Sequence, residues 1–410
     1  MKKYIKTNLI LVVMIFTALK LMDFNQTMSA YWIGPYLSAA TNFHWSEFTL
    51  YVNMDEIKEF AKLSTSELFQ YHFIKTDDLM LYNYLGKGLV LLIILSKKIF
   101  FWQGDLQSLQ SLQYVFHIFI SITVFNLFQK RYQKILFFIL YTINPLILWV
   151  ANFPFYYFWQ VIPSTIFIYW YFKKDIKLPL LMVFSVIFAY IYITRPTVLF
   201  LIILFYILFA FRNSIKSSLV GLGLFLLLIN LAPSLSIGPW HTMYVGVGAY
   251  SNPYNIKLSD NDGYKYYKEK TGKIVSSSNI MHDDIKDDYY KELKIRLLEI
   301  TKENPLMIVR NAMFNIAQSY SFGYSKSINK KVGNYSIVYL SIFSGVVVML
   351  LLLYTQQYLI FLAIGFAGGT FTLYYPPILV YMYGNFILLV IGFIGIVDFF
   401  INKRHTNNAR

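Results

Sequence analysis

Apolar residues recur along the chain in runs of about 15 to 20, separated by short polar stretches. A helix of that length crosses roughly 30 Å of hydrocarbon and satisfies its own backbone hydrogen bonds in lipid. The pattern therefore predicts an all-α polytopic membrane protein, a bundle of about ten transmembrane helices, in which Asn144-Pro145 breaks or bends one span. The predicted spans are 8–23, 108–128, 135–152, 155–172, 178–194, 197–211, 217–237, 334–354, 358–375 and 378–401.

Positive charges gather in the short segments that this topology places on one side. Fourteen Lys and Arg residues there face a single acid, Asp175. Cytoplasmic loops carry such an excess, so both termini are predicted to be cytoplasmic, in a plasma membrane of bacterial type. The apolar run 85–102 is interrupted by lysines and would reverse this topology if it crossed. It is therefore predicted to lie on the outer surface as an interfacial helix.

Composition supports the membrane assignment and excludes several other classes. Hydrophobic residues make up 57% of the 410 residues and charged residues only 14%, which is too apolar for a soluble enzyme. The net charge of +15 sits in clusters between apolar runs rather than on one soluble face, so no nucleic-acid partner is expected. The chain has no cysteine, which excludes disulfides and thiolate chemistry. The basic, apolar start resembles a signal peptide but lacks a small-residue cleavage site, so it is predicted to be a retained first span.

Two long hydrophilic segments, about 24–107 and 238–333, remain on the outer side. They divide the chain into a module 1–237 that contains the first loop, a second loop 238–333, and C-terminal transmembrane helices 334–410. Helical spacing is predicted for 55–69 and, with one apolar stripe, for 283–303. The cytoplasmic loops hold no Gly-rich phosphate loop and are too short for a nucleotide-binding domain. Chemistry is therefore expected outside, without a nucleotide or redox cofactor.

The first loop concentrates carboxylates, among them the adjacent pairs Asp55-Glu56 and Asp77-Asp78. A carboxylate next to the membrane surface can act as general base for an incoming hydroxyl. It can also hold a divalent cation such as Mg²⁺ or Mn²⁺ through oxygen ligands. Adjacent acids in loops are more often simply solvated, and the sequence leaves these readings open.

Five further residues are candidates for binding a substrate. Arg195 lies where two predicted spans meet at the outer interface, where a guanidinium calls for an anionic partner or for headgroup contact. Lys87 is flanked by glycines that would let the backbone approach a phosphate. His241, Tyr244 and Tyr250 lie in the turn-rich opening of the second loop, where such rings either stack on sugars or form an interfacial belt.

Several strings resemble the GT-C superfamily of polytopic glycosyltransferases. The segment from Trp240 to Tyr254, with Asp260 to Tyr264 after it, looks like the second outer loop of bacterial relatives of the protein O-mannosyltransferases. The acidic first loop, Tyr141 to Pro145 and Thr194 to Thr197 fit the same pattern. The resemblance implies inverting transfer of a sugar from a polyprenyl-phosphate donor to a hydroxyl of a glycan, lipid or protein. It also implies a first-loop base, for which Asp55-Glu56 looks most like the family's acidic motif. That motif usually follows the first span closely, where this chain has Asp23 without an adjacent acid.

Two other functions fit the same membrane context. A polymerase or ligase of surface polysaccharide would use diphosphate-linked oligosaccharides and rely on outer arginines, of which the second loop holds Arg296 and Arg310. A transporter or flippase for lipid-linked saccharides would carry charges within its middle spans. The predicted middle spans carry no charged residue apart from Arg195, which lies near one end of them.

Overall fold

The computed structural model describes residues 2–22, 30–45, 48–82, 86–231, 239–275, 283–321 and 336–408, and the predicted alternative base Asp23 lies outside them. The described chain is mostly helical, which confirms the all-α class. It forms two compact units. Unit 1 comprises 1–235, 352–367 and 383–410, and unit 2 comprises 236–351 and 368–382.

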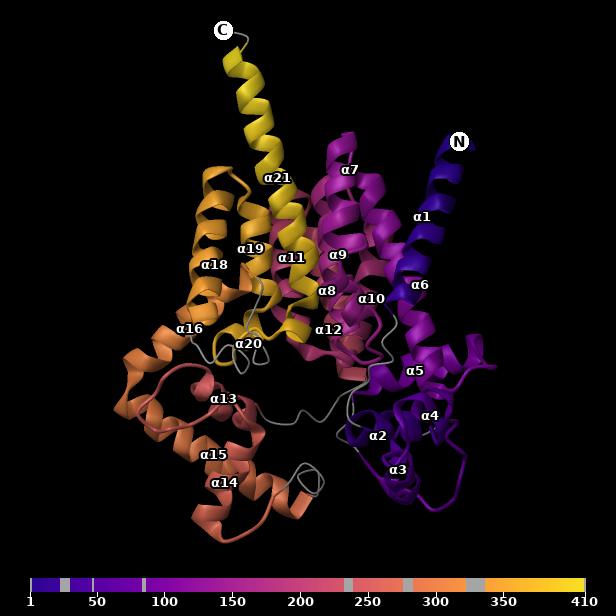
Figure 1. Ribbon diagram of the computed structural model, residues 1–410, viewed down its shortest axis with the longest axis vertical. Coiled ribbons are helices and arrows are strands. Elements are labelled where there is room, and N and C mark those ends of the chain that lie inside the picture. The colour runs from indigo at the N-terminus through magenta and orange to yellow at the C-terminus, as the bar shows by residue number, and fades with distance from the viewer. Residues whose placement is uncertain are drawn as a thin grey trace. The chain divides into compact units, whose positions relative to one another are not determined.

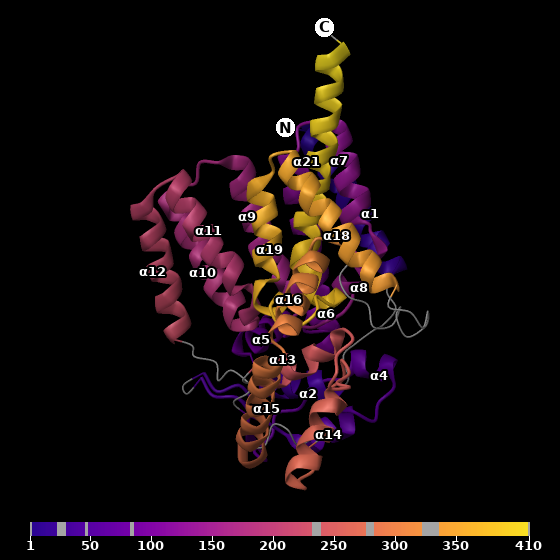
Figure 2. The same cartoon turned by 90° about the vertical axis from the view of Figure 1, so that its left-hand side faces the viewer.

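Long apolar helices make up the upper part of unit 1 (Figures 1 and 2). Helices α10, α11 and α12 pack against one another, α1 packs on α6, and α21 packs on α9 and α19. Figure 1 shows α1 and α21 reaching the same upper end of unit 1 with their chain termini. The elements are α1 (Lys2–Leu21), α6 (Asp105–Leu127), α7 (Arg131–Phe137), the π-helix η1 (Phe138–Thr142), α8 (Pro145–Ala151), η2 (Phe158–Gln160), α9 (Val161–Lys173), α10 (Leu178–Thr194), η3 (Pro196–Val198), α11 (Leu199–Arg212), α12 (Ile215–Leu231), α19 (Tyr358–Ala367) and α21 (Tyr383–Asn408).

Among the described residues, three helices are long and apolar enough to cross a membrane: Asp105–Leu127, Ile337–Tyr354 and Leu379–Arg404. A fourth span is formed if Arg131–Thr142 and Pro145–Ala151 count as one, bent by 53° at the predicted Asn144-Pro145 break. Asn144 caps the second half by accepting a hydrogen bond from the Leu146 N–H. Five apolar helices are shorter: 7–21, 178–194, 196–212, 215–231 and 358–367. The bundle of about ten spans stays a prediction.

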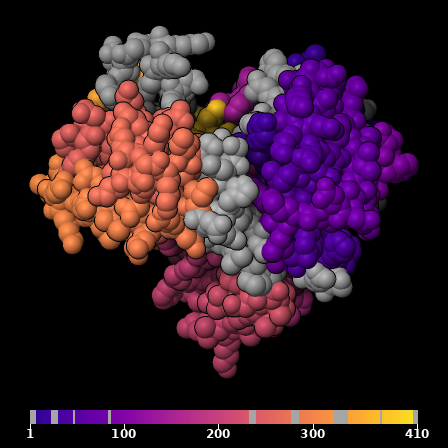
Figure 3. Space-filling model, turned by 90° about the horizontal axis from the view of Figure 1, so that it is seen from below, coloured from indigo at the N-terminus to yellow at the C-terminus, as the bar shows by residue number. Residues whose placement is uncertain are grey.

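The first-loop elements of unit 1 form the indigo and purple surface in Figure 3. Gly34 on α2 lets Ile57 and Phe60 of α3 approach closely, since a Cβ there would meet Ile57 at 3.3 Å. The predicted helix 55–69 is two helices, because Ser64 and Glu67 form a capping box that starts the second. The run 85–102 contains one helix, α5, packed on α2, α6 and α10. The elements are α2 (Ala30–Thr41), β1 (Tyr51–Val52), α3 (Met54–Phe60), α4 (Thr65–Gln70), β2 (Met80–Leu81), antiparallel to β1, and α5 (Lys87–Ile99).

Unit 2 has its own hydrophobic core. The predicted amphipathic helix 283–303 is confirmed as α15, whose stripe residues Tyr289, Leu293 and Ile300 are fully buried. They pack against α13 and α14. The described elements are α13 (Trp240–Gly246), η4 (Val247–Ala249), α14 (Asp260–Thr271), α15 (Asp283–Glu303), α16 (Pro305–Ser319), α18 (Ser336–Tyr354, as far as Leu351), α20 (Gly369–Thr372) and η5 (Leu379–Met382).

Candidate functional site

The backbone next to Lys87 and the backbone next to Arg195 meet at one end of unit 1, although the two residues are far apart in sequence. Lys87 begins α5, and Arg195 follows the last residue of α10. The Arg195 guanidinium lies over the rings of Tyr156 and Tyr157, at 4.6 and 5.2 Å from their centroids. The Lys87 ammonium lies 5.4 Å from the centroid of Phe48. Aromatic faces stabilise both cations and fix their positions.

Two glycines make this meeting possible. A Cβ at residue 86 would lie 3.2 Å from the carbonyl oxygen of Thr194, and a Cβ at residue 88 only 2.2 Å from Thr194 Oγ1. The Tyr190 hydroxyl also donates to the Gly88 carbonyl at 2.9 Å. The backbone beside Lys87 therefore contacts the end of α10, which explains the glycines without a phosphate.

The electrostatics of this end favour an anion. Burial lowers the pKa of Lys87, so its positive charge is less stable there than in water. Tyr36 lies near Gly86 and Arg195, and burial raises its pKa, so its phenol stays neutral. Burial also raises the pKa of Tyr82 to about 12. This end of unit 1 thus carries cations and neutral hydroxyl groups, which suits an anion.

The two predicted bases, both on α3, differ strongly from each other. Asp55 has an exposed side chain that pairs with Lys58 at 2.8 Å, and this pairing lowers its pKa. Glu56 is partly buried, and burial raises its pKa although its Oε1 accepts the Ile74 N–H at 2.8 Å. Within the described chain, Glu56 Oε2 is buried without a hydrogen-bond partner. Glu56 is thus the better proton acceptor of the two.

A buried acid that the sequence analysis did not single out is Asp105, the first residue of α6. Its Oδ2 accepts hydrogen bonds from Lys97 Nζ at 2.7 Å and from the Phe73 N–H at 3.1 Å. His72 Nδ1 lies 3.5 Å from its Oδ1. Its position directly before an apolar run marks a helix start, but nothing local in the sequence signals its burial.

The structure separates the predicted base from the predicted cations. Glu56 is electrostatically coupled to Asp105 and Lys97, near the C-terminal end of α5. Lys87 and Lys97 lie ten residues apart on that helix, or about 15 Å at 1.5 Å per residue. The predicted binding residues Asp77 and Asp78 are exposed in the segment before β2. The backbone segments next to Lys87 and Arg195 are therefore in contact, whereas the predicted acids lie elsewhere in unit 1.

In unit 2, His241 links three helices. Its Nδ1 lies 2.5 Å from the Tyr289 hydroxyl, and its Nε2 lies 3.1 Å from Asp260 Oδ1. Gly263 leaves room for this arrangement, because a Cβ there would meet the Tyr289 oxygen at 2.6 Å. Burial strongly raises the pKa of Tyr289, so its hydroxyl stays protonated and can donate to Nδ1 while Nε2–H donates to Asp260. Both ring nitrogens are then engaged, which suits a link between α13, α14 and α15.

The two other predicted sugar-stacking residues are buried in unit 2. Tyr244 packs against Tyr266 with ring centroids 5.5 Å apart. The Tyr250 hydroxyl donates to Asn315 and accepts from Gln318, both at 2.7 Å. Tyr244 and Tyr250 belong to different core clusters. Their side chains face the interior of unit 2, and their role in binding stays a prediction.

The carboxylates of the first loop leave a divalent cation possible as a cofactor. Across the described ranges, no three His, Cys, Asp or Glu side chains lie close enough together to hold a metal ion jointly.

Comparison with known proteins gives no relative. No protein-family model, no curated protein and no solved structure matches the chain.

Proposed function

We propose that the protein is a membrane-embedded glycosyltransferase that moves a sugar from a polyprenyl-phosphate donor to an acceptor hydroxyl on the extracytoplasmic face. The observation that carries this proposal is the contact between the glycines that flank Lys87 and the end of α10, where the Arg195 guanidinium lies over two tyrosine rings. The apolar helices around it suit a lipid-linked substrate.

The chemistry of this end matches a phosphate ester. Arginine presents a planar donor group that pairs with phosphate oxygens, and lysine adds a point charge. Because burial disfavours the Lys87 charge, an anion that neutralises it gains more than it would at an exposed lysine. A neutral sugar without a phosphate would not obtain this gain.

The proposed reaction replaces one bond at the anomeric carbon by another and transfers one proton. The acceptor oxygen attacks the anomeric carbon, the bond from that carbon to the phosphate oxygen breaks, and the polyprenyl phosphate leaves. The acceptor proton passes to a carboxylate, for which we propose Glu56 over Asp55 because of its raised pKa. Since Glu56 lies toward the other end of α5, this assignment requires α3 to approach the end of α10 during turnover.

The test is donor binding to the purified protein in nanodiscs, measured by native mass spectrometry with a polyprenyl monophosphate. Arg195→Gln should weaken binding about 10- to 100-fold, as expected for a lost hydrogen-bonded charge worth about 1.5–3 kcal/mol. Arg212→Gln is the matched control, because Arg212 also lies over an aromatic ring, Trp170, but at the end of α11.

Unchanged binding in Arg195→Gln would remove this site from the proposal. Retention of a diphosphate-linked oligosaccharide in place of the monophosphate would instead favour a polymerase or flippase.

A further inference from the structure

The helix α16 in unit 2 buries several polar residues and exposes a row of apolar residues. Asn315 is 1% and Gln318 0% exposed, and both hydrogen-bond the buried Tyr250 hydroxyl. On the other face, Leu306 is 79%, Val309 55% and Met313 63% exposed. A helix at the surface of a soluble domain shows the opposite arrangement. The outer face of α16 therefore fits an apolar environment.

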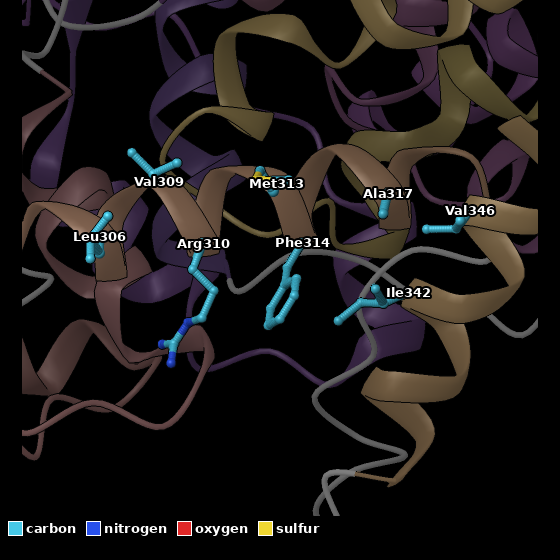
Figure 4. A pocket seen from close by; sticks show the side chains of 8 residues that line it. All are labelled: Leu306, Val309, Arg310, Met313, Phe314, Ala317, Ile342 and Val346. Carbon is cyan, nitrogen blue, oxygen red and sulfur yellow. The ribbon is translucent and has the colours of Figure 1, made fainter.

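An apolar groove of about 400 Å³ continues from this face to α18 (Figure 4). The close-up shows Phe314 and Arg310 extending from the same side of α16, with Ile342 of α18 directed toward that side. The two helices touch at the far end of the groove, where a Cβ at Gly345 would lie 1.8 Å from the Ala317 carbonyl oxygen. Its lining is apolar apart from one charged side chain: Leu306, Val309, Arg310, Met313, Phe314, Ala317, Ile342 and Val346.

One wall of the groove is α18, a helix whose exposed surface is suited to lipid. The stretch Ile337–Tyr354 is long and apolar enough to span a membrane, and only 22% of it is buried by protein. Leu340, Phe343 and Leu350 each expose more than 60% of their surface. A bilayer that covers α18 reaches Ile342 and Val346 on the same helix, and through them the groove. Acyl chains can thus fill the groove without a second protein.

Arg310 supplies the polar end of the site. Its Nη2 donates to the Ser251 carbonyl and to Asn311, both at 2.9 Å, which fixes the guanidinium. In the part of the chain that the structure describes, no carboxylate lies within ion-pair distance of it. A fixed guanidinium beside an apolar groove matches a phosphate attached to an acyl chain.

We infer that α16 lies at the extracytoplasmic interface of the membrane, with the Leu306–Val309–Met313 ridge toward lipid. The groove between α16 and α18 then holds an acyl chain of a bilayer phospholipid, and the phosphate of that lipid pairs with Arg310. The segment predicted from sequence as the water-exposed second loop thus contains a membrane-bound helix. This inference is independent of the proposed glycosyl transfer.

Spin labels on single cysteines test the position of α16, since the native chain has no cysteine. Labels are placed by Val309→Cys and Met313→Cys on the ridge, by Val346→Cys on the span, and by Lys265→Cys on an exposed turn of α14 as the aqueous control. In phosphatidylcholine–phosphatidylglycerol nanodiscs, the first three should be accessible to dissolved oxygen and protected from a water-soluble nickel chelate. The control should show the reverse.

Each other outcome overturns the inference. Nickel access at residues 309 and 313, with oxygen access at 346, would place α16 in water while α18 still spans. Low access to both reagents at 309 and 313 would mean that protein, such as a second copy of this chain, covers the ridge.

The phosphate contact has its own test. Native mass spectrometry should show that Arg310→Gln retains about tenfold less phosphatidylglycerol than the native chain. Arg296→Gln is the matched control, because Arg296 pairs with Glu299 at 2.9 Å on α15, and its lipid retention should be unchanged. Equal retention by the native chain and Arg310→Gln would remove Arg310 from the site.

Discussion

The close approach of α5 to α10 makes Gly88→Ala the sharpest structural perturbation. A Cβ at this position would lie 2.2 Å from Thr194 Oγ1, 2.6 Å from its amide nitrogen and 2.7 Å from its Cα. Ordinary contact to a Cβ begins at about 3.4 Å. Rotating the Thr194 side chain relieves only the first overlap, because the other two atoms are backbone. One of the two helix ends must therefore move.

The expected loss of stability is about 1–2 kcal/mol. Overpacking a tight contact typically costs about 1–3 kcal/mol. Replacing glycine by alanine within a helix offsets up to about 1 kcal/mol of that cost. Gly223→Ala on α12 separates the two effects, since a Cβ there meets no atom within 4 Å. This control should keep or raise the free energy of unfolding.

Reversible denaturation of the purified protein in mixed micelles, followed by circular dichroism, measures both variants. Gly88→Ala should also weaken binding of the polyprenyl monophosphate, because displacing α5 moves Lys87 relative to the end of α10. Adding Thr194→Ala should restore only part of the stability, since the backbone overlap remains. If Gly88→Ala and Gly223→Ala were equally stable, the contact between α5 and α10 would not exist as described.

Three further variants test the acids and the helix link. Burial raises the pKa of Glu56 above 4.5, so the folded chain holds this proton more tightly than the unfolded chain. The free energy of unfolding should therefore fall as pH rises from about 4.5. Glu56→Gln should flatten this decline when unfolding is measured from pH 4 to 7. Asp105→Ala leaves Lys97 without its ion-pair partner and should lower the free energy of unfolding by about 3 kcal/mol. This value is at the low end for a broken buried pair, because Lys97 is 24% exposed. An unchanged unfolding midpoint would contradict the pairing. Tyr289→Phe removes one buried hydrogen bond and should cost about 1–3 kcal/mol in hydrogen-exchange protection of α15, whereas native protection would show that the bond contributes nothing.

Local periodicity predicted α15 well because its environment is uniform along one face. Tyr289, Leu293, Leu297 and Ile300 recur at helical spacing, and unit 2 buries that whole stripe. The prediction of one continuous helix over 55–69 was wrong. The signal for two helices was present, since Ser64 followed by Glu67 matches a capping box, but the apolar spacing on either side outweighed it.

The glycines beside Lys87 show where sequence stops being informative. A glycine permits close approach of some group to the backbone, and the sequence does not say which group. A glycine beside Lys87 would allow either a phosphate or the end of α10 to approach the backbone, and the sequence does not distinguish the two. Contact with Thr194 depends on a pairing of distant segments, as does the burial of Asp105 by Lys97 and Phe73. Neither leaves a local pattern in the chain.

The orientation of α16 exposes a more general ambiguity. A helical pattern separates an apolar face from a polar face but does not say which of the two lies inside the protein. On α16 the polar face meets Tyr250, so the apolar face must look outward, and only the environment makes that arrangement stable. Counting runs long enough to span a bilayer misses such a helix, because apolar residues occupy only one of its faces. On the inference above, the lipid boundary in unit 2 therefore lies at α16 rather than at the start of α18, and the water-exposed part of the second loop is correspondingly shorter.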